Sequence, residues 1–444
     1  MTIEAVVALG ICAVVAASIV TTRIGLVATV AYAAFFSLAL VPVSLISDSG
    51  AFHVGIAGSS PDLRTFTLVI AVGAVLLTFI AKPPLVGIFV PLLLWIAIGA
   101  LFIWPSDPPG IAGVVQLCIA VLAWGIGMRA ARSDPDSRLR RGLIVLIVIV
   151  VLAHSGVAVL QALGLNINAV AAADQEILGS RVNGLSNHPN NLGKILVISI
   201  ALLLSLLNSA KDRARLIWIT IGVAFVPLVL AQGRANLAAA AALVTGWVLL
   251  QPSLHLSRKL SVILGLGVAG LAASGVIITR FEEDPTGGVR GEILSYAARI
   301  VSTFFWTGTG PNRYTIENAP LTGSFIPVHN SFVLALAELG IVGFVLLFAP
   351  IVVMTVAAWR RRNMVSASGD AARAIVASAL PMVMIAYTGW GMLATSVLSL
   401  GMFCFGFMWG QVTSRPPVGE RDAQALSDGA AVVRVRRPRL RAHA

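Results

Sequence analysis

Residues 327–348 read PVHNSFVLALAELGIVGFVLLF, and this stretch decides the class of fold. After His329 and Asn330 it continues as an apolar run of the length needed to enter a hydrocarbon core about 30 Å thick. The run contains one carboxylate, Glu338. Ionisable groups are costly in lipid, so a histidine at the start of a predicted membrane helix and a glutamate within it require a chemical explanation.

The composition of the whole chain is that of a membrane protein. Of its 444 residues, 58% are hydrophobic and 11% are charged. Apolar runs recur at 4–21, 25–46, 64–81, 84–104, 111–129, 142–163, 191–208, 214–231, 235–251, 260–279, 330–357, 371–390 and 392–411. The sequence therefore predicts an all-α, polytopic membrane protein with about 12–13 transmembrane helices and a large outward-facing loop. We expect a transmembrane domain over 1–411 and a separate tail over 412–444.

The distribution of Lys and Arg predicts the orientation. Short loops rich in these residues stay in the cytoplasm, and they recur here at 82, 129–141, 211–215, 257–259 and 360–362. The intervening loops, which we expect to face outward, are 47–63, 105–110, 164–190, 232–234 and 280–329. The arginine-rich tail is expected to be disordered, cytoplasmic and attracted to anionic membrane lipids. The net charge of +12 thus reflects topology, and no nucleic-acid partner is expected.

Several arginines contradict this pattern because they fall in predicted outer loops. They are Arg64, Arg181, Arg234, Arg280, Arg290, Arg299 and Arg313. A single one could be a snorkelling residue or a ligand of a lipid headgroup. Their concentration in a few outer loops indicates a site for an anion.

Arg181 opens RVNGLSNHPNNLGKI, a turn-rich segment that leads into the 191–208 run. Asn190 or Asn191 is predicted to cap this helix, which would leave free amide donors at its positive end. An anion would bind well there. His188 in the same segment is either a turn residue or a functional one.

Arg234 lies in a hairpin so tight that its guanidinium must stay at the outer membrane boundary. Such a position suits a ligand of a lipid phosphate, although a snorkelling helix end has the same pattern. In the longest outer loop, 280–329, apolar spacing predicts a short amphipathic or re-entrant helix over 290–305 at the outer surface. The acidic run 282–284 is interpreted as a solvated loop, so no metal site is predicted.

His329 has the chemistry of a general base. At the start of an outward helix and near arginines that can hold an anionic leaving group, it could deprotonate a hydroxyl while pyrophosphate departs. Guanidinium groups can match the charge of that leaving group without a metal. On a continuous helix Glu338 would face away from His329, so we expect it to pair with another buried polar group or to stay protonated.

Four segments follow one another along the chain: Arg181-x-x-Gly184 with Pro189-Asn190-x-Leu192; Gly233-Arg234; Arg290 with Gly308-x-Gly310; and His329-Asn330 with Glu338-Leu339-Gly340-Ile341-x-Gly343. Together they resemble the bacterial O-antigen ligase and Wzy-type O-antigen polymerase superfamily. The resemblance covers about 181–348. Gly233 departs from the serine usual before the arginine in that family, while the charged residue is kept.

This resemblance implies a GT-C type glycosyltransferase of the bacterial cytoplasmic membrane, active on its outer face. The donor would be a glycan on undecaprenyl pyrophosphate, transferred with inversion to a glycan or lipid-glycan acceptor without metal or cofactor. His329 would be the base, and Arg181, Arg234 and Arg290 would hold the pyrophosphate. Further substrate-binding candidates are Asn190 and Asn330, together with Arg299 and Arg313, which are added for their position.

Two alternatives remain open at the level of sequence. Ligases and polymerases share these motifs and differ mainly in the acceptor. A transporter or flippase for lipid-linked glycans is the competing class, and it predicts ionisable residues at mid-bilayer on several helices and often an internal repeat. Here the unusual charges lie on the outer side and those within the helices are few, chiefly Glu338, which favours the enzyme.

Overall fold

The computed structural model describes residues 25–40, 64–134, 137–165, 167, 181–272, 274–275, 290–323, 327–389, 393 and 395–414. The α-helices in these ranges are α2 Leu26–Ala39, α3 Thr65–Ile80, α4 Val90–Ile98, α5 Pro108–Arg132, α6 Arg138–Ala162, α8 Pro189–Ser205, α9 Ala214–Leu230, α10 Arg234–Leu250, α11 Leu256–Ala272, α13 Arg290–Thr303, α14 Tyr314–Thr322, α15 Ser331–Arg361, α16 Ala367–Thr388 and α17 Thr395–Thr413. Short 3-10 turns at Gly87–Phe89 and Asn208–Arg213 and a π-helical turn at Gly99–Ile103 accompany them. The predicted all-α class is confirmed. The predicted span at 4–21 and the tail beyond 414 lie outside the described residues.

Within the described residues, five helices, α5, α6, α15, α16 and α17, are long and apolar enough to cross a membrane. Shorter apolar helices accompany them, namely α2, α3, α8, α9, α10 and the segment Gly87–Ile103. Each of these helices lies on one of the predicted apolar runs. The predicted polytopic membrane protein is therefore confirmed.

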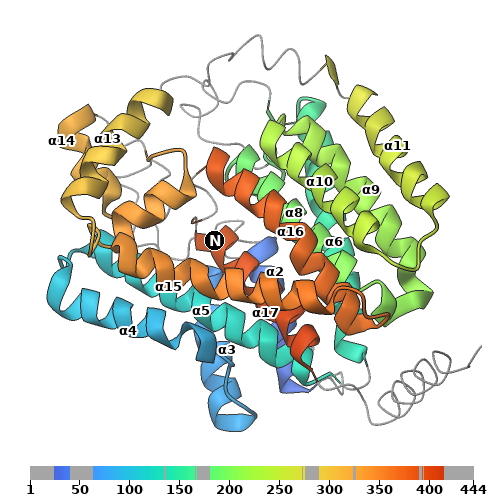
Figure 1. Ribbon diagram of the computed structural model, residues 1–444, viewed down its shortest axis with the longest axis horizontal. Helices are drawn as coiled ribbons and strands as arrows, with labels where there is room; N and C mark the ends of the chain where they lie inside the picture. Colours follow the sequence, from blue (N-terminus) through green and yellow to red (C-terminus); the bar gives the residue numbers. More distant parts are fainter. Residues whose placement is uncertain are drawn as a thin grey trace, which may run out of the picture.

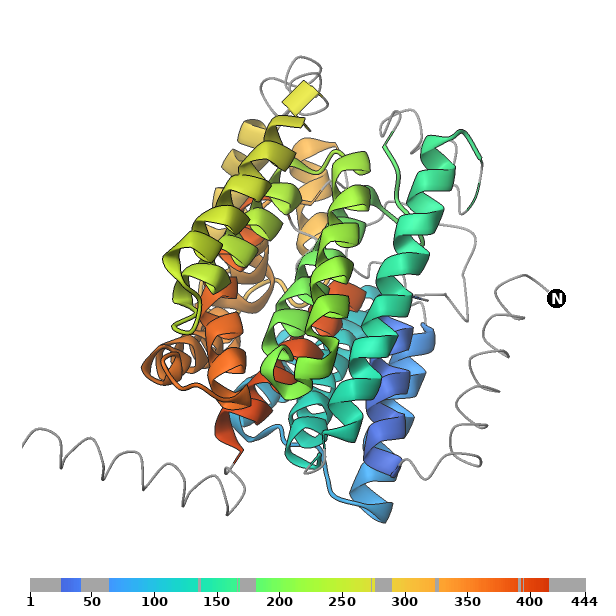
Figure 2. The same cartoon turned by 90° about the vertical axis from the view of Figure 1, so that its right-hand side faces the viewer.

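Helices packed side by side form a bundle, with α13 and α14 on one flank and α11 on another (Figures 1 and 2). α5 and α17 lie closest together: a Cβ on Gly127 would fall 2.1 Å from the carbonyl oxygen of Phe403, and one on Gly406 would fall 2.3 Å from that of Trp124. Such small residues let membrane helices approach closely. α8 is buried on all sides apart from Asn190 in its first turn, as expected for a helix that is apolar around its whole circumference.

The arginine-rich segments gather at one end of the bundle. Arg132 at the end of α5 donates to Thr413 Oγ1 (2.8 Å), and Arg213 before α9 donates to the carbonyl of Arg141 in α6 (3.1 Å). Arg361 at the end of α15 donates to the carbonyl of Val412. α13 and α14 lie toward the opposite end (Figure 2). This separation agrees with the alternation of loops predicted from the Lys and Arg pattern.

α15 is broken at Gly340, where φ is 64° and ψ is 178°. The predicted helix over 330–357 is thus interrupted, because the preceding loop pairs with it. The replacing hydrogen bonds are Thr309 N to Ala337 O (2.9 Å), Gly310 N to Glu338 O (3.0 Å), Trp95 Nε1 to Leu339 O (3.2 Å) and Ile341 N to Phe305 O (2.8 Å). The break satisfies backbone groups that lipid could not. Glu338 lies before the break, on the helical part of α15 that follows His329.

Replacing Gly340 by alanine is expected to destabilise the protein by at least about 2 kcal/mol, because φ is left-handed and the backbone is close. A Cβ at this position would lie 2.3 Å from the carbonyl oxygen of Trp306. Thermal unfolding of the protein in detergent measures the effect. Gly265→Ala in α11, where an added Cβ meets nothing within 4 Å, is the matched control and should not lower the midpoint. Equal midpoints for the two variants would contradict this account of the break.

Candidate active site

The loop that carries Arg181 is fixed to α6. The side-chain oxygen of Gln161 accepts from the backbone N–H groups of Asn183 (3.1 Å) and Gly184 (2.9 Å). Gly184 has a left-handed φ of 57°, and a Cβ there would lie 3.1 Å from His154 Nδ1. The spacing Arg-x-x-Gly thus has a physical reason, since the glycine lets the loop turn tightly against α6.

Hydrogen bonds to two neighbouring segments hold the Arg181 side chain. Its Nε donates to the carbonyl of Ala231 (3.0 Å), in the turn between α9 and α10, and its Nη2 donates to Asn190 Oδ1 (2.7 Å). Asn236 in α10 donates to the carbonyl of Asn190 (3.2 Å). These contacts bring Arg181 and Asn190 to the N-terminus of α10, where Arg234 is the first helical residue and is half-buried.

His188, and neither Asn190 nor Asn191, caps α8. Its Nδ1 accepts from the backbone N–H of Asn190 (3.0 Å), so the predicted asparagine cap is wrong. Burial, together with smaller electrostatic contributions from Arg181, Lys194 and His329, lowers the pKa of His188 to about 3. His188 is therefore neutral at physiological pH and structural. The contribution of His329 to this shift is consistent with a position near His188.

The neutral cap predicts a specific pH dependence. The unfolded chain titrates His188 near its ordinary pKa of 6.5, whereas the folded protein takes up that proton only near pH 3. Between these values the unfolded state binds more protons, so stability is lost as pH falls from 6.5 towards 3, with a slope of at most about 1.4 kcal/mol per pH unit. His188→Asn keeps a capping side chain without a titrating group.

We expect the thermal midpoint of His188→Asn to fall less between pH 7 and pH 4.5 than that of the unmodified protein. Other acid-sensitive groups are common to both proteins and cancel in the comparison. An identical fall in both would mean that the neutral cap has no part in acid sensitivity.

His329 lies immediately before α15, where Asn330 is the N-cap. Asn330 Oδ1 accepts from the backbone N–H groups of Phe332 (2.9 Å) and Val333 (3.2 Å). The next residue, Ser331, donates to the carbonyl of Gly389 at the end of α16 (2.6 Å). The His329 side chain is half-buried. Asn330 thereby fixes the start of the helix next to the predicted base.

The N-termini of α8, α10 and α15 meet at this end of the bundle. Hydrogen bonds join the start of α8 to the start of α10, and His329 before α15 acts on the cap of α8. Each N-terminus has a partial positive charge and backbone donors. Together with Arg181, Arg234 and His329 they form a cluster that we call the cationic cluster, and its chemistry suits a polyvalent anion.

Lys194 is a member of this cluster that the sequence interpretation missed. It lies in the second turn of α8, is only 4% exposed, and its Nζ lies 3.5 Å from Asn191 Oδ1. The available signal was a lysine in the otherwise apolar run KILVISIALLL. Lysine is rarely fully buried in proteins without a partner, so its burial points to a function.

The remaining predicted site residues have other surroundings. α13 begins at Arg290, of which the structure describes only the backbone, and Arg299 is exposed on the same helix. Arg313 is 8% exposed and forms ion pairs with Asp107, the cap of α5, and with Glu317 (3.0 Å). These carboxylates match the charge of Arg313, so its contacts are those of a residue that joins α14 to α5.

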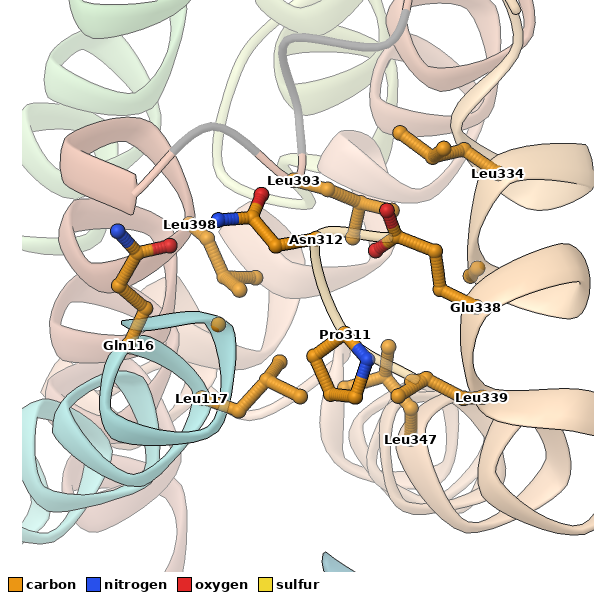
Figure 3. Close-up of a pocket in the computed structure, with 12 residues that line it drawn as sticks. Gln116, Leu117, Pro311, Asn312, Leu334, Glu338, Leu339, Leu347, Leu393 and Leu398 are labelled. Atoms are coloured by element: carbon orange, nitrogen blue, oxygen red, sulfur yellow. The ribbon is translucent and has the colours of Figure 1, made fainter. Parts of the chain in front are cut away.

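Glu338 points into a small cavity of about 30 Å³, enough for a water molecule, where Gln116 and Asn312 are the other polar side chains in the lining. Figure 3 shows Glu338 and Gln116 on opposite walls with Asn312 between them. The Oε1 atom of Glu338 accepts from the backbone N–H of Tyr314 (3.4 Å) at the start of α14. The expected partner of Glu338 is thus the loop before α14, and the carboxylate holds that loop against the break in α15.

The family comparison agrees with this arrangement. Residues 191–348, from the first turn of α8 to the middle of α15, match the family model described as O-antigen ligase. A comparison with curated proteins gives no match. The matched region holds Lys194, Arg234, His329 and the broken segment of α15. Over this region the chain is similar to O-antigen ligases, which supports its membership in the superfamily of O-antigen ligases and Wzy-type polymerases.

Proposed function

We propose that the protein transfers a glycan from undecaprenyl pyrophosphate to an acceptor hydroxyl with inversion of the anomeric centre. The observation that carries this proposal is the cationic cluster, in which Arg181, Arg234 and His329 meet the N-termini of α8, α10 and α15. A membrane glycosyltransferase needs such a site for the charge of its leaving group.

In this mechanism Arg181 and Arg234 bind the diphosphate, with Arg290 as a third candidate. His329 takes the proton of the acceptor hydroxyl as the oxygen attacks the anomeric carbon. The bond from that carbon to the phosphate oxygen breaks, and the lipid diphosphate leaves with both electrons of the bond. Guanidinium groups and helix N-termini stabilise the added negative charge. A single displacement of this kind inverts the configuration.

An apolar groove supports a lipid-linked donor. It lies among α15, α16 and α17, has a volume of about 280 Å³ and is lined almost entirely by apolar side chains. One end is at Ser331 and Ala386, next to His329, and the other reaches Thr355 and Val356 further along α15. A polyprenyl chain attached to a diphosphate in the cationic cluster could lie in this groove.

The charge distribution supports an active site outside the cytoplasm. The arginine-rich segments are at the opposite end of the bundle from the cationic cluster, and such segments stay in the cytoplasm. We therefore propose a bacterial cytoplasmic membrane protein with its site on the outer face and its C-terminus inside.

The test is transfer by purified protein in EDTA. The donor is a lipid-pyrophosphate-linked oligosaccharide, offered with a lipid-glycan acceptor and with a second lipid-linked unit. We expect transfer with inversion to proceed in EDTA, because guanidinium groups supply the positive charge that a metal ion would otherwise supply. The preferred acceptor separates ligase from polymerase. Transbilayer movement of labelled lipid in liposomes without transfer would instead support a flippase, and a strict need for a divalent ion would contradict the mechanism.

A further inference from the structure

Lys194 is placed where the cationic cluster meets the apolar groove. A Cβ built on Gly389 would lie 3.9 Å from Lys194 Nζ, and the carbonyl of Gly389 accepts from Ser331. Ser331 is both a wall of the groove and the first residue of α15, two positions after His329. The ammonium is therefore close to the groove entrance.

The surroundings of Lys194 do not neutralise its charge. Among the described residues, no carboxylate forms an ion pair with it, and its hydrogen bond to Asn191 Oδ1 is long at 3.5 Å. Arg181, His329 and Lys194 all contribute to the lowered pKa of His188, so the three side chains lie around the same residue. A buried ammonium among cations needs an anion, because burying an unpaired charge is costly.

The position further distinguishes Lys194 from the arginines. Arg181 precedes α8 and Arg234 begins α10, whereas Lys194 lies within α8, five residues after its start and about 7.5 Å along its axis. Of the two phosphates in a lipid diphosphate, the one bonded to the lipid lies nearer the groove. The other, bonded to the sugar, lies further out.

We propose that Lys194 binds the phosphate that is bonded to the lipid chain, while Arg181 and Arg234 bind the phosphate that is bonded to the sugar. This inference rests on the proposed function and assigns the two phosphates of its donor to different residues. It follows that Lys194 recognises lipid monophosphates and diphosphates alike. The arginines distinguish between them.

The test measures binding of farnesyl diphosphate and farnesyl monophosphate to the full-length protein in detergent. Loss of a charged hydrogen bond weakens binding about tenfold or more. We expect Lys194→Met to weaken both probes by about that factor, and Arg181→Lys to weaken the diphosphate while leaving the monophosphate within about twofold. Lys259→Met is the matched control, because Lys259 in α11 donates only to the carbonyl of Leu249 in the described residues, and it should change neither affinity.

Loss of affinity for the diphosphate alone in Lys194→Met, or no loss for either probe, would overturn the assignment. Thermal unfolding checks the fold, and Lys194→Gln, with the same expected loss, replaces Lys194→Met if the latter does not fold. A merely structural lysine would lower the midpoint without changing the affinity of the folded protein. Failure of the proposed function has a different signature: either the unmodified protein binds neither probe, or it binds both through Lys194 and transfers no glycan.

Discussion

Replacing His329 by alanine is expected to lower the rate of glycan transfer by about 10²–10⁴-fold, the usual contribution of a general base. The protein should still insert and fold, because α15 keeps its Asn330 cap and the contact of Ser331 with Gly389. The donor should still bind, since Arg181 and Arg234 remain. The effect should therefore fall on kcat more than on KM.

Two measurements separate this role from a structural one. Added imidazole should restore part of the lost rate in His329→Ala, because it can replace the missing base. His255→Ala is the matched control: His255 is exposed between α10 and α11, away from the cationic cluster, and its loss should leave transfer unchanged. Full activity in His329→Ala would exclude His329 as the base.

Replacing Arg181 by lysine is expected to lower kcat/KM for the lipid-diphosphate donor by about tenfold to a hundredfold. Lysine keeps the positive charge but not the planar fork, so a bidentate contact with phosphate is lost. The bonds from Arg181 Nε to Ala231 and from Nη2 to Asn190 cannot both be kept by one ammonium at the same distances. The positive charge at position 181 would then no longer be held in a fixed orientation within the cationic cluster.

Transfer assays over a range of donor concentrations measure this loss. Arg258→Lys in the exposed start of α11 is the matched control and should change kcat/KM by less than about twofold. If Arg181→Lys were as active as Arg258→Lys, then charge alone at position 181 would be sufficient and the oriented guanidinium would have no role.

The sequence was sufficient to predict the class of fold, because long apolar runs are enough to recognise membrane helices. It also indicated Arg181, Arg234 and His329 as candidates, since positive and titratable groups in predicted outer loops are unusual, and their roles stay a prediction. It could not show that the starts of α8, α10 and α15 meet. That convergence depends on the packing of α8 against α10 and α16, which the pattern of a single chain does not encode.

The misses have local physical causes. Gly340 lies in an apolar run and reads as an ordinary helix residue, because the break is stabilised by Thr309, Gly310 and Trp95 from distant segments. His188, and not an asparagine, caps α8, because its Nδ1 accepts a hydrogen bond from the backbone N–H of Asn190. Lys194 was missed because a lysine within a helix is interpreted as surface until its burial is known.

A structure of the protein with undecaprenyl pyrophosphate bound would test the central claim most directly. The account predicts the diphosphate within hydrogen-bond reach, about 3 Å, of Arg181 and Arg234, beside His329 and the N-termini of α8, α10 and α15. The polyprenyl chain should lie in the groove among α15, α16 and α17. A diphosphate bound at the arginine-rich end of the bundle, or held by residues outside the cationic cluster, would contradict it.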